Sequence, residues 1–292
     1  MLKTYLTDSK KKVETYLETA LQSPNREYSK LYEAMKYSLM MGGKRIRPIL
    51  VMAVMESLGK EPAPLMDMVC AIELVHTYSL IHDDLPAMDN DDYRRGALTN
   101  HKVFGDGMAI LAGDALLTYA FQLMATNTLA TPEQRANCLV ALATGSGPEG
   151  MVGGQAFDIM SEGKVLPLEE LQVLHKGKTG ALFAAAVKIG LILGEADEIT
   201  CVQYMKYADA LGLLFQITDD ILDVTGTLEE LGKMPGSDEN LHKATYVSIL
   251  GLDGAKAEAQ RVATEAKSAL ENTTAHTAIL AAIVDYLIAR AN

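Results

Sequence analysis

The hydrophobic residues of this chain recur mostly at intervals of three and four, the spacing that places them on one face of a helix. Alternating apolar runs joined by tight turns, which are typical of strands, are scarce. Pro48, Pro132 and Pro167 fall where helices are expected to begin, and Gly59 and Gly194 fall where they are expected to end. The pattern predicts helices over residues 3–21, 28–41, 46–58, 65–84, 94–101, 107–126, 132–144, 149–161, 168–176, 178–194, 198–224, 238–251, 253–270 and 275–290.

This pattern predicts an all-α protein with a single domain over residues 1–292. The segments 178–194 and 205–224 are apolar on nearly every face and should lie in the centre of a helical bundle. The 292 residues, 49% of them hydrophobic, suffice for one large core. No Ser/Gly-rich linker, charge block or internal repeat divides the chain.

The overall charge argues against nucleic acid as a partner. A formal net charge of −12 and a pI near 5.0 are opposite to the basic surface that nucleic acids require. Any positive site must therefore be local. The first 21 residues carry charges throughout and contain no apolar run resembling a signal peptide.

The cysteines and apolar stretches indicate a cytoplasmic protein that does not enter a membrane. Cys70, Cys138 and Cys201 are widely spaced and form no CxxC pair, so buried thiols in a reducing compartment are expected. The longest apolar stretch, residues 181–194, is too short to span a bilayer and contains Lys188.

Two aspartate clusters, 83–89 (DDLPAMD) and 219–223 (DDILD), each follow an apolar run. Such dense carboxylates repel one another unless water or cations screen them, and Mg²⁺ prefers oxygen ligands. Asp219 and Asp223 lie one helical turn apart, whereas Pro86 must end a helix, so that the chain bends between Asp83 and Asp89. A solvated acidic helix end and an acidic turn are the alternative, but two clusters predict one metal-filled cleft with two walls.

Basic residues accompany these acids. Residues 43–48 (GKRIRP) place three cations at an expected helix start, where free N–H groups favour an anion. Residues 93–96 (YRRG) follow the first aspartate cluster, residues 176–180 (KGKTG) flank another expected helix start, and Lys233 and Lys243 follow the second cluster. Two diphosphates offset by about three Mg²⁺ ions would suit this charge pattern. The substrate is therefore expected to be rich in phosphate.

Three features could also be explained otherwise. His76 lies two helical turns before Asp83, and although a lone histidine is often a core residue, a nearby anion site favours a phosphate donor. Residues 145–150 match GxGxxG, but a helical pattern rather than a strand precedes them. The ExxH pairs at 73–76 and 239–242 would suit a di-iron bundle, which leaves the basic residues without a role.

In this order the motifs resemble those of the trans-isoprenyl diphosphate synthases, most closely the short-chain bacterial farnesyl diphosphate synthase type. The resemblance covers nearly the whole chain and rests on residues 43–48 (GKRIRP), 79–89 (SLIHDDLPAMD), 94–96 (RRG), 154–158 (GQAFD), 178–180 (KTG), 215–223 (FQITDDILD), 232–233 (GK) and 243–246 (KATY). It implies a homodimer in which an isoprenoid synthase-type helical bundle surrounds a deep central apolar cavity. The implied activity is condensation of isopentenyl diphosphate with dimethylallyl or geranyl diphosphate to give farnesyl diphosphate.

The resemblance also implies roles for individual residues. Asp83, Asp84, Asp89, Asp219, Asp220 and Asp223 would bind Mg²⁺ or Mn²⁺; Arg94, Lys178, Thr179, Gln216 and Lys233 would bind the allylic diphosphate; Lys44, Arg47, His76 and Arg95 would bind isopentenyl diphosphate. Tyr78 and Ser79 lie five and four residues before Asp83, about 6–8 Å along the helix, where they would limit the product to fifteen carbons. An ordinary core tyrosine is the alternative for Tyr78.

Related activities remain open on the sequence alone. A geranylgeranyl or geranyl diphosphate synthase would differ only in the depth of the cavity. A terpene cyclase would have no use for the group of Lys44, Arg47, His76 and Arg95, and a non-catalytic partner subunit would be expected to lack one of the aspartate motifs, both of which are intact.

Overall fold

The computed structural model describes residues 1–164, 166–226 and 244–290, and most of these residues are helical. The prediction of an all-α fold is confirmed. The chain forms two compact units, each described by itself: the first comprises Met1, 3–52 and 61–139, and the second comprises Leu2, 53–60 and 140–292. The chain passes between the units within helix α3 (Ile46–Ser57), returns between residues 60 and 61, and passes again within helix α7 (Pro132–Ser146). A single functional domain stays a prediction.

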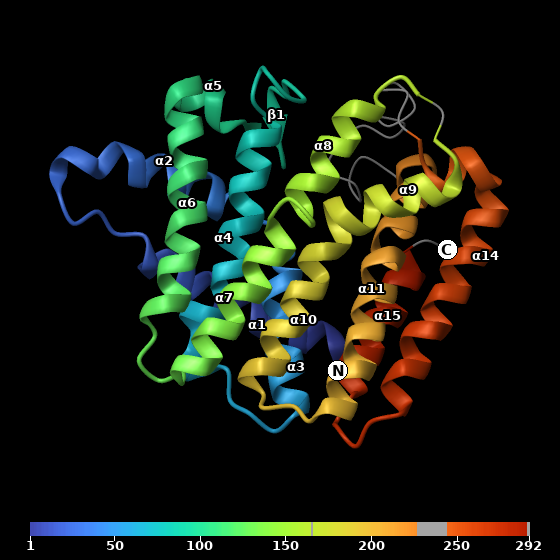
Figure 1. Ribbon diagram of the computed structural model, residues 1–292. Coiled ribbons are helices and arrows are strands. Elements are labelled where there is room, and N and C mark those ends of the chain that lie inside the picture. Colours follow the sequence, from blue (N-terminus) through green and yellow to red (C-terminus); the bar gives the residue numbers. More distant parts are fainter. Residues whose placement is uncertain (165, 227–243, 291–292) are drawn as a thin grey trace. The chain divides into compact units, whose positions relative to one another are not determined.

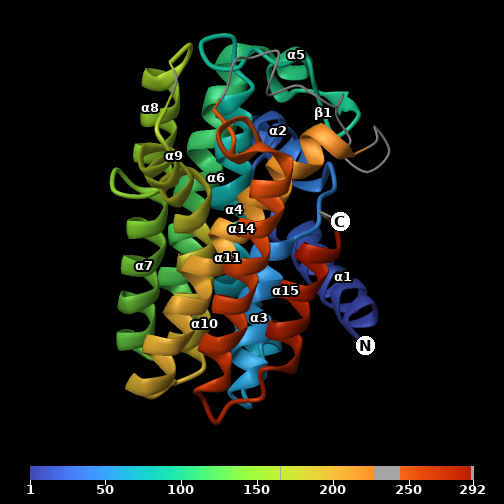
Figure 2. The ribbon, with the colours of Figure 1, turned by 90° about the vertical axis from the view of Figure 1, so that its right-hand side faces the viewer.

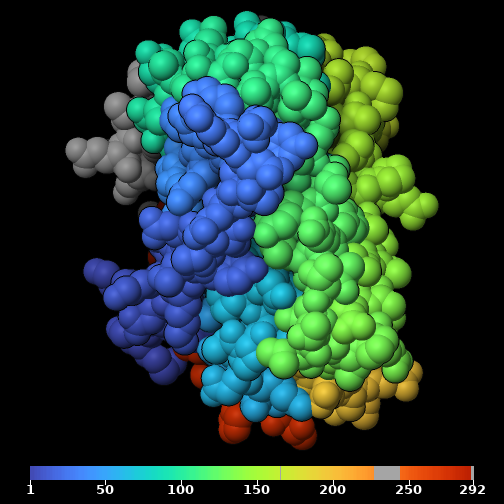
Figure 3. Space-filling view, turned by 90° about the vertical axis from the view of Figure 1, so that its left-hand side faces the viewer, coloured from blue at the N-terminus to red at the C-terminus, as the bar shows by residue number. Residues whose placement is uncertain are grey.

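The first unit is built around two long neighbouring helices, α4 and α6 (Figure 1). Besides parts of α3 and α7, its helices are α1 (Leu2–Ala20), η1 (Arg26–Tyr28), α2 (Ser29–Met40), η2 (Ala63–Leu65), α4 (Met66–Asp83), α5 (Asn100–Phe104) and α6 (Asp106–Thr126). Helix α2 packs against α4, α5 and α6, and Figure 3 shows it in blue over the green surface of α6. Helix α4 is buried along most of its length, so it forms the core of this unit.

The C-terminal part of α4 lies very close to α6. A Cβ atom at Gly113 would be 2.1 Å from His82 Nε2, so the imidazole lies directly against this glycine of α6. His82 Nε2 also lies 3.1 Å from the carbonyl oxygen of Ile110. The end of α4, where Asp83 is located, is therefore fixed against α6.

The predicted helix over 94–101 is wrong. These residues form a small antiparallel hairpin of β1 (Tyr93–Arg94) and β2 (Ala97–Leu98), followed by the short helix α5. Arg95 and Gly96 adopt φ values of 53° and 79°, the left-handed conformation of a tight hairpin turn. Thr99, whose hydroxyl donates to the Asp91 carbonyl at 2.7 Å, precedes the helix. The Arg-Gly pair is thus a turn signal and not part of a helix.

The second unit consists mainly of long helices around α11 (Figure 2). Besides the ends of α3 and α7, it contains α8 (Met151–Ser161), α9 (Leu168–His175), the π-helical turn η3 (Lys176–Gly180), α10 (Ala181–Leu193), α11 (Glu198–Thr225), α14 (Tyr246–Glu271) and α15 (Ala278–Arg290). Helix α11 contacts α10, α14 and α15. Most residues of α10 and many of α11 are buried, as their apolar patterns predict.

The expected break between helices 238–251 and 253–270 corresponds to a kink in α14. Gly251 has a φ of 72°, which interrupts the helical conformation. A capping box begins this helix: the Thr245 hydroxyl accepts from the backbone N–H of Ser248, and the Ser248 hydroxyl accepts from the backbone N–H of Thr245. Residues 238–243 of the predicted helix lie outside the described residues.

Two segments, Ala63–Asp83 and Asp106–Thr126, are long and apolar enough by length and composition to cross a membrane, with mean hydropathies of 1.2 and 1.4. The first is 61% buried inside the protein, which fits a core helix, and the second is 39% buried. A core helix meets the same criteria as a membrane span, so these helices are weak evidence for a membrane. The absence of membrane association stays a prediction.

The π-helical turn η3 lies against α8 and α11 so closely that each contact leaves no room for a side chain. A Cβ atom at Gly154 in α8 would lie 2.0 Å from the backbone nitrogen of Lys178. On another side, a Cβ at Gly212 in α11 would lie 2.8 Å from the Cα of Gly180. Because these neighbours are backbone atoms, they cannot move aside without displacing the turn.

Gly154→Ala is therefore expected to lower the free energy of unfolding by about 1–3 kcal/mol, the usual cost of overpacking. Gly107→Ala is the matched control, since a Cβ at Gly107 in α6 would meet no atom within 4 Å. That change should stabilise the protein by up to about 1 kcal/mol through helix propensity. Urea denaturation of both variants measures the difference, and equal stabilities would contradict the tight crossing.

Candidate functional site

The first aspartate cluster lies where α4 ends and the chain turns. Helix α4 ends at Asp83, Asp84 is its C-cap, and the backbone N–H of Asp89 donates to the carbonyl of Asp83 at 2.8 Å. Pro86 lies in this turn, as expected of a residue that cannot continue a helix. Asp84 is buried, Asp83 is half-buried and Asp89 is exposed. The predicted bend between Asp83 and Asp89 is confirmed.

Asp84 forms a bidentate ion pair with Arg94 of the hairpin. Arg94 Nε donates to both carboxylate oxygens at 2.8 and 2.9 Å, and Nη2 lies 2.6 Å from Oδ1. Burial raises the pKa of the Asp84 carboxyl, and the Arg94 guanidinium counteracts this shift. The structure thus joins a residue expected to bind metal to one expected to bind diphosphate. A ligand at this site would have to share or exchange these bonds.

Three basic side chains from separate segments of the first unit converge. Arg47 at the start of α3 is buried, His76 on α4 is half-buried and Arg95 in the hairpin turn is exposed. Burial, together with the positive charges of Arg47 and Arg95, lowers the pKa of His76 well below its ordinary value, so the imidazole is neutral at neutral pH. Burial, opposed by Glu73 and reinforced by Arg95, lowers the pKa of Arg47 to about 10. A bound anion would relieve this mutual repulsion.

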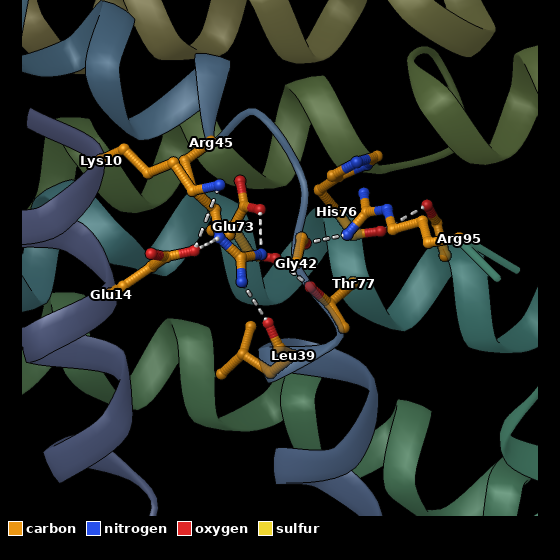
Figure 4. A network of polar contacts seen from close by, with 10 residues as sticks. Lys10, Glu14, Leu39, Gly42, Arg45, Glu73, His76, Thr77 and Arg95 are labelled. Carbon is orange, nitrogen blue, oxygen red and sulfur yellow. Dashed lines mark hydrogen bonds and ion pairs between the residues drawn. The ribbon is translucent and has the colours of Figure 1, made fainter. Parts of the chain in front are cut away.

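The loop before α3 is shaped around Arg95. Its Nη1 donates to the carbonyl oxygen of Gly42, and Figure 4 shows the guanidinium beside His76. A Cβ atom at Gly43 would lie 2.6 Å from Arg95 Nη1, so glycine allows the guanidinium to rest on the loop. Lys44, next in the loop, is exposed. All four residues that the resemblance assigns to isopentenyl diphosphate are therefore neighbours in space or along this loop.

Tyr78 is buried one turn before the end of α4. Its ring packs edge-on against that of His82, with ring centroids 5.6 Å apart and an interplanar angle of 82°. His82 in turn contacts α6, so Tyr78 lies on the same face of α4. Burial and the charge of Asp83 raise the pKa of Tyr78. Ser79 is half-buried, and its hydroxyl donates to the carbonyl of His76 at 2.9 Å.

In the second unit the second aspartate cluster lies near the C-terminal end of α11, as predicted: Asp219 is half-buried, and Asp220 and Asp223 are buried. Asp220 accepts two hydrogen bonds from neutral donors, at 2.8 Å from Gln216 Nε2 and at 2.8 Å from the backbone N–H of Tyr246. The hydroxyl of Thr179 donates to Gln216 Oε1 at 3.1 Å. Asp220 therefore anchors a chain of polar groups that includes two residues expected at the allylic site.

Lys178 and Thr179 lie in the π-helical turn η3. The expectation of a helix start here is wrong, because α9, η3 and α10 follow one another without a break. The Lys178 ammonium instead donates to Asp158 Oδ2 of α8 at 2.6 Å. Lys233, also expected at the allylic site, lies outside the described residues.

Sequence reasoning missed the partners of these residues. Asp158 appears in the motif GQAFD, but nothing in its spacing relates it to Lys178. Glu73 belongs to an ExxH pair, yet its carboxylate bonds to Arg45 and so is unsuited to a di-iron site; the second ExxH pair lies outside the described residues. Helix α7, and not a strand, leads into the GxGxxG segment, where a Cβ at Gly145 would lie 2.6 Å from the Cβ of Ala185. That glycine serves helix packing.

The donor chemistry of both clusters fits Mg²⁺. All six predicted ligands are carboxylates, the hard oxygen donors that this ion prefers. Within residues 1–164, 166–226 and 244–290, no three His, Cys, Asp or Glu side chains form a ready-made metal site.

A pocket of about 740 Å³ opens in the second unit between α9, α11 and α14, and its lining includes Lys176, Lys206 and Arg261. It contains no residue of either aspartate cluster, and Arg261 is already paired with Glu258. This pocket is therefore not the predicted site. The deep central cavity stays a prediction.

Comparison with known structures identifies the class of protein. The apo structure of an FPP/GFPP synthase from Zymomonas mobilis has a TM-score of 0.88 to this chain at 36% sequence identity, covering 98% of both chains. The fold is thus that of the all-α isoprenoid synthases. The polyprenyl synthetase family model matches residues 28–287, and the chain belongs to this family.

The curated relatives include enzymes with different products. Farnesyl diphosphate synthase of Geobacillus stearothermophilus is 48% identical over 98% of this chain and 97% of its own length. Farnesyl diphosphate synthase of Micrococcus luteus is 45% identical over 99% of both chains. The chloroplastic geranylgeranyl pyrophosphate synthase of Capsicum annuum is 43% identical over 99% of this chain and 79% of its own length.

Proposed function

We propose that this protein is a Mg²⁺-dependent prenyltransferase that condenses isopentenyl diphosphate with dimethylallyl or geranyl diphosphate to give farnesyl diphosphate and diphosphate. Family membership over nearly the whole chain supports the reaction class. The observation that carries the proposal is the group of Arg47, His76 and Arg95. His76 lies on the helix that ends at the first aspartate cluster, and Arg95 follows Arg94, which pairs with Asp84. One unit therefore contains both carboxylates, which can bind metal ions, and a separate group of cations. This combination suits two diphosphate substrates, one bound through metal ions and the other bound by side chains alone.

The residues divide between these two diphosphates. Lys44, Arg47, His76 and Arg95 hold isopentenyl diphosphate through side chains alone, so that it is positioned but does not ionise. The allylic diphosphate is held by Arg94, Lys178, Thr179, Gln216 and Lys233, together with Mg²⁺ on the aspartates. Asp84 and Asp220 already accept bonds from Arg94 and from Gln216 and Tyr246. Asp83, Asp84, Asp89 and Asp219 are proposed as metal ligands, with Asp220 and Asp223 as their partners in the second cluster.

The reaction requires charge neutralisation on a leaving group and protection of a cation. Bound Mg²⁺ would neutralise negative charge on the allylic diphosphate as its C–O bond breaks. Arg94 and Lys178 add positive charge where this negative charge develops. The oxygens of Thr179 and Gln216 offer dipoles to the allylic cation, which the alkene of isopentenyl diphosphate then attacks. Loss of a proton to the departing diphosphate completes the product and requires no separate base.

We propose that Tyr78, with Ser79 beside it, stops elongation at fifteen carbons. Tyr78 is a large buried side chain one turn below Asp83, on the face of α4 that contacts α6. A geranylgeranyl or geranyl diphosphate synthase is the second candidate, because relatives with a geranylgeranyl product are nearly as similar to this chain. A homodimer in the cytoplasm, with about three Mg²⁺ ions per site, completes the proposal.

Asp83→Ala and Asp219→Ala are each expected to lower turnover by about two orders of magnitude or more, because each removes a direct metal ligand. Incubation with dimethylallyl and isopentenyl diphosphates, with and without Mg²⁺, measures the activity. Asp91→Asn removes an exposed carboxylate near the first cluster and is the matched control. Wild-type turnover by either alanine variant, with an intact circular dichroism spectrum, would refute the metal role.

Tyr78→Ala is expected to extend the product to twenty carbons and beyond, since it removes the ring that would meet the growing chain. Chromatography of the products, after removal of the diphosphate, measures the length. Tyr78→Phe retains the ring and should leave a fifteen-carbon product. An unchanged product spectrum in the alanine variant would show that another residue sets the length.

Lys44→Ala is expected to raise the KM for isopentenyl diphosphate about tenfold, the loss of one charge-assisted hydrogen bond, with little change in kcat. Lys11→Ala, which removes an exposed lysine of α1, is the control for net charge. Steady-state kinetics with each substrate varied in turn provides the test. A selective loss of affinity for the allylic substrate would reverse the assignment of the two diphosphate sites.

A further inference from the structure

We propose that Arg45 and Glu73 are positioning residues whose buried ion pair holds the loop 42–47 in the conformation that binds isopentenyl diphosphate. The inference rests on the proposed function and concerns how its homoallylic site is assembled. Arg45 lies between Lys44 and Arg47 in sequence and carries the same charge. Its side chain nevertheless has no solvent exposure, whereas Lys44 is exposed.

The Arg45 guanidinium is tied to three helices of the first unit (Figure 4). Nη1 donates to Glu73 Oε1 of α4 at 2.8 Å, and Nη2 donates to the carbonyl of Leu39 in α2 at 2.6 Å. Nε lies 3.6 Å from Glu14 Oε1 of α1, which is a peripheral contact because Glu14 is one-third exposed. The main bonds therefore connect the start of α3 to α2 and α4.

The loop that these bonds hold has an unfavourable backbone conformation. Arg45 has a φ of 53°, and Gly42 and Gly43 have φ values of 99° and 121°. Glycine tolerates such values, but the left-handed region is unfavourable for a residue with a Cβ atom. The backbone at Arg45 is therefore not maintained by local preference. The buried ion pair supplies the constraint that turns Arg45 inward and leaves Lys44 facing outward.

Glu73 also brings a carboxylate close to the basic side chains of Arg47 and Arg95. It lies one helical turn before His76, and its backbone carbonyl accepts a bond from the Thr77 hydroxyl at 2.8 Å. Its charge opposes the lowering of the pKa of Arg47 that burial and Arg95 produce. Glu73 thus joins the loop to α4 and offsets part of the positive charge around Arg47.

A contribution to stability alone would not explain why Arg45 and Glu73 form a buried ion pair. Replacing a buried ion pair by apolar residues of similar size is often neutral or stabilising, because the desolvation of both charges is avoided. Positioning and stability can therefore be separated by experiment. The double variant Arg45→Met/Glu73→Met removes both charges while filling the space, whereas Glu73→Gln leaves the arginine without its counter-charge.

The test combines thermal unfolding, steady-state kinetics and calorimetric titration with isopentenyl diphosphate, all on the full-length protein. The double variant is expected to unfold near the wild-type temperature, yet its KM and Kd for isopentenyl diphosphate should rise at least about tenfold, with the allylic KM within about twofold of wild type. Glu73→Gln should raise the same constants. Glu14→Gln, which removes only the peripheral contact, is the matched control and should behave as wild type.

Two results would overturn the inference. One is a double variant that has wild-type stability and wild-type affinity for isopentenyl diphosphate; the other is an equal loss of affinity for both substrates. Failure of the proposed function is recognised separately, because the wild-type protein would then show no condensation. In that case, calorimetric titration with inorganic diphosphate still compares the anion affinities of the wild-type protein and the double variant. Equal affinities would again overturn the role of the ion pair.

Discussion

Three ion pairs, each formed within one unit, hold charged side chains of the candidate site, and the geometry of the site depends on them. Arg94 neutralises Asp84, Asp158 neutralises Lys178, and Glu73 neutralises Arg45. Like charges concentrated in a half-buried region would otherwise repel one another and draw in water. These pairs keep each group in a defined orientation. A phosphate or metal ion then exchanges partners with side chains that are already placed.

Much of the fold follows from local sequence signals. Long helices such as α4, α6 and α11 have apolar patterns and boundaries strong enough to be predicted within a few residues. The turn after Asp83 follows from Pro86, and the central position of α10 follows from its uniformly apolar surface. The helix predicted over 94–101 is wrong because the left-handed turn at Arg95 and Gly96 outweighs the helix propensity of their neighbours.

The pairings within the site could not be predicted in the same way. The bonds from Arg45 to Glu73, from Lys178 to Asp158 and from the Tyr246 backbone to Asp220 span 28, 20 and 26 residues, and no periodicity connects these pairs. Three neighbouring cations at 44, 45 and 47 look equivalent in the sequence. Only the burial of each side chain shows that Arg45 faces the core whereas Lys44 faces solvent. The motifs identify which residues matter, and tertiary contacts decide what each of them does.

The π-helical turn at Lys176–Gly180 makes the length of this segment important as well as its composition. A π turn contains one residue more than an α-helical turn, so it changes the angular relation between the residues before and after it. Deleting one residue here would restore a regular helix but rotate the following side chains by roughly 100°. The glycine crossings at Gly154 and Gly212 leave no room to absorb that rotation. An insertion or deletion in this segment should therefore disrupt the protein far more than one in a surface loop.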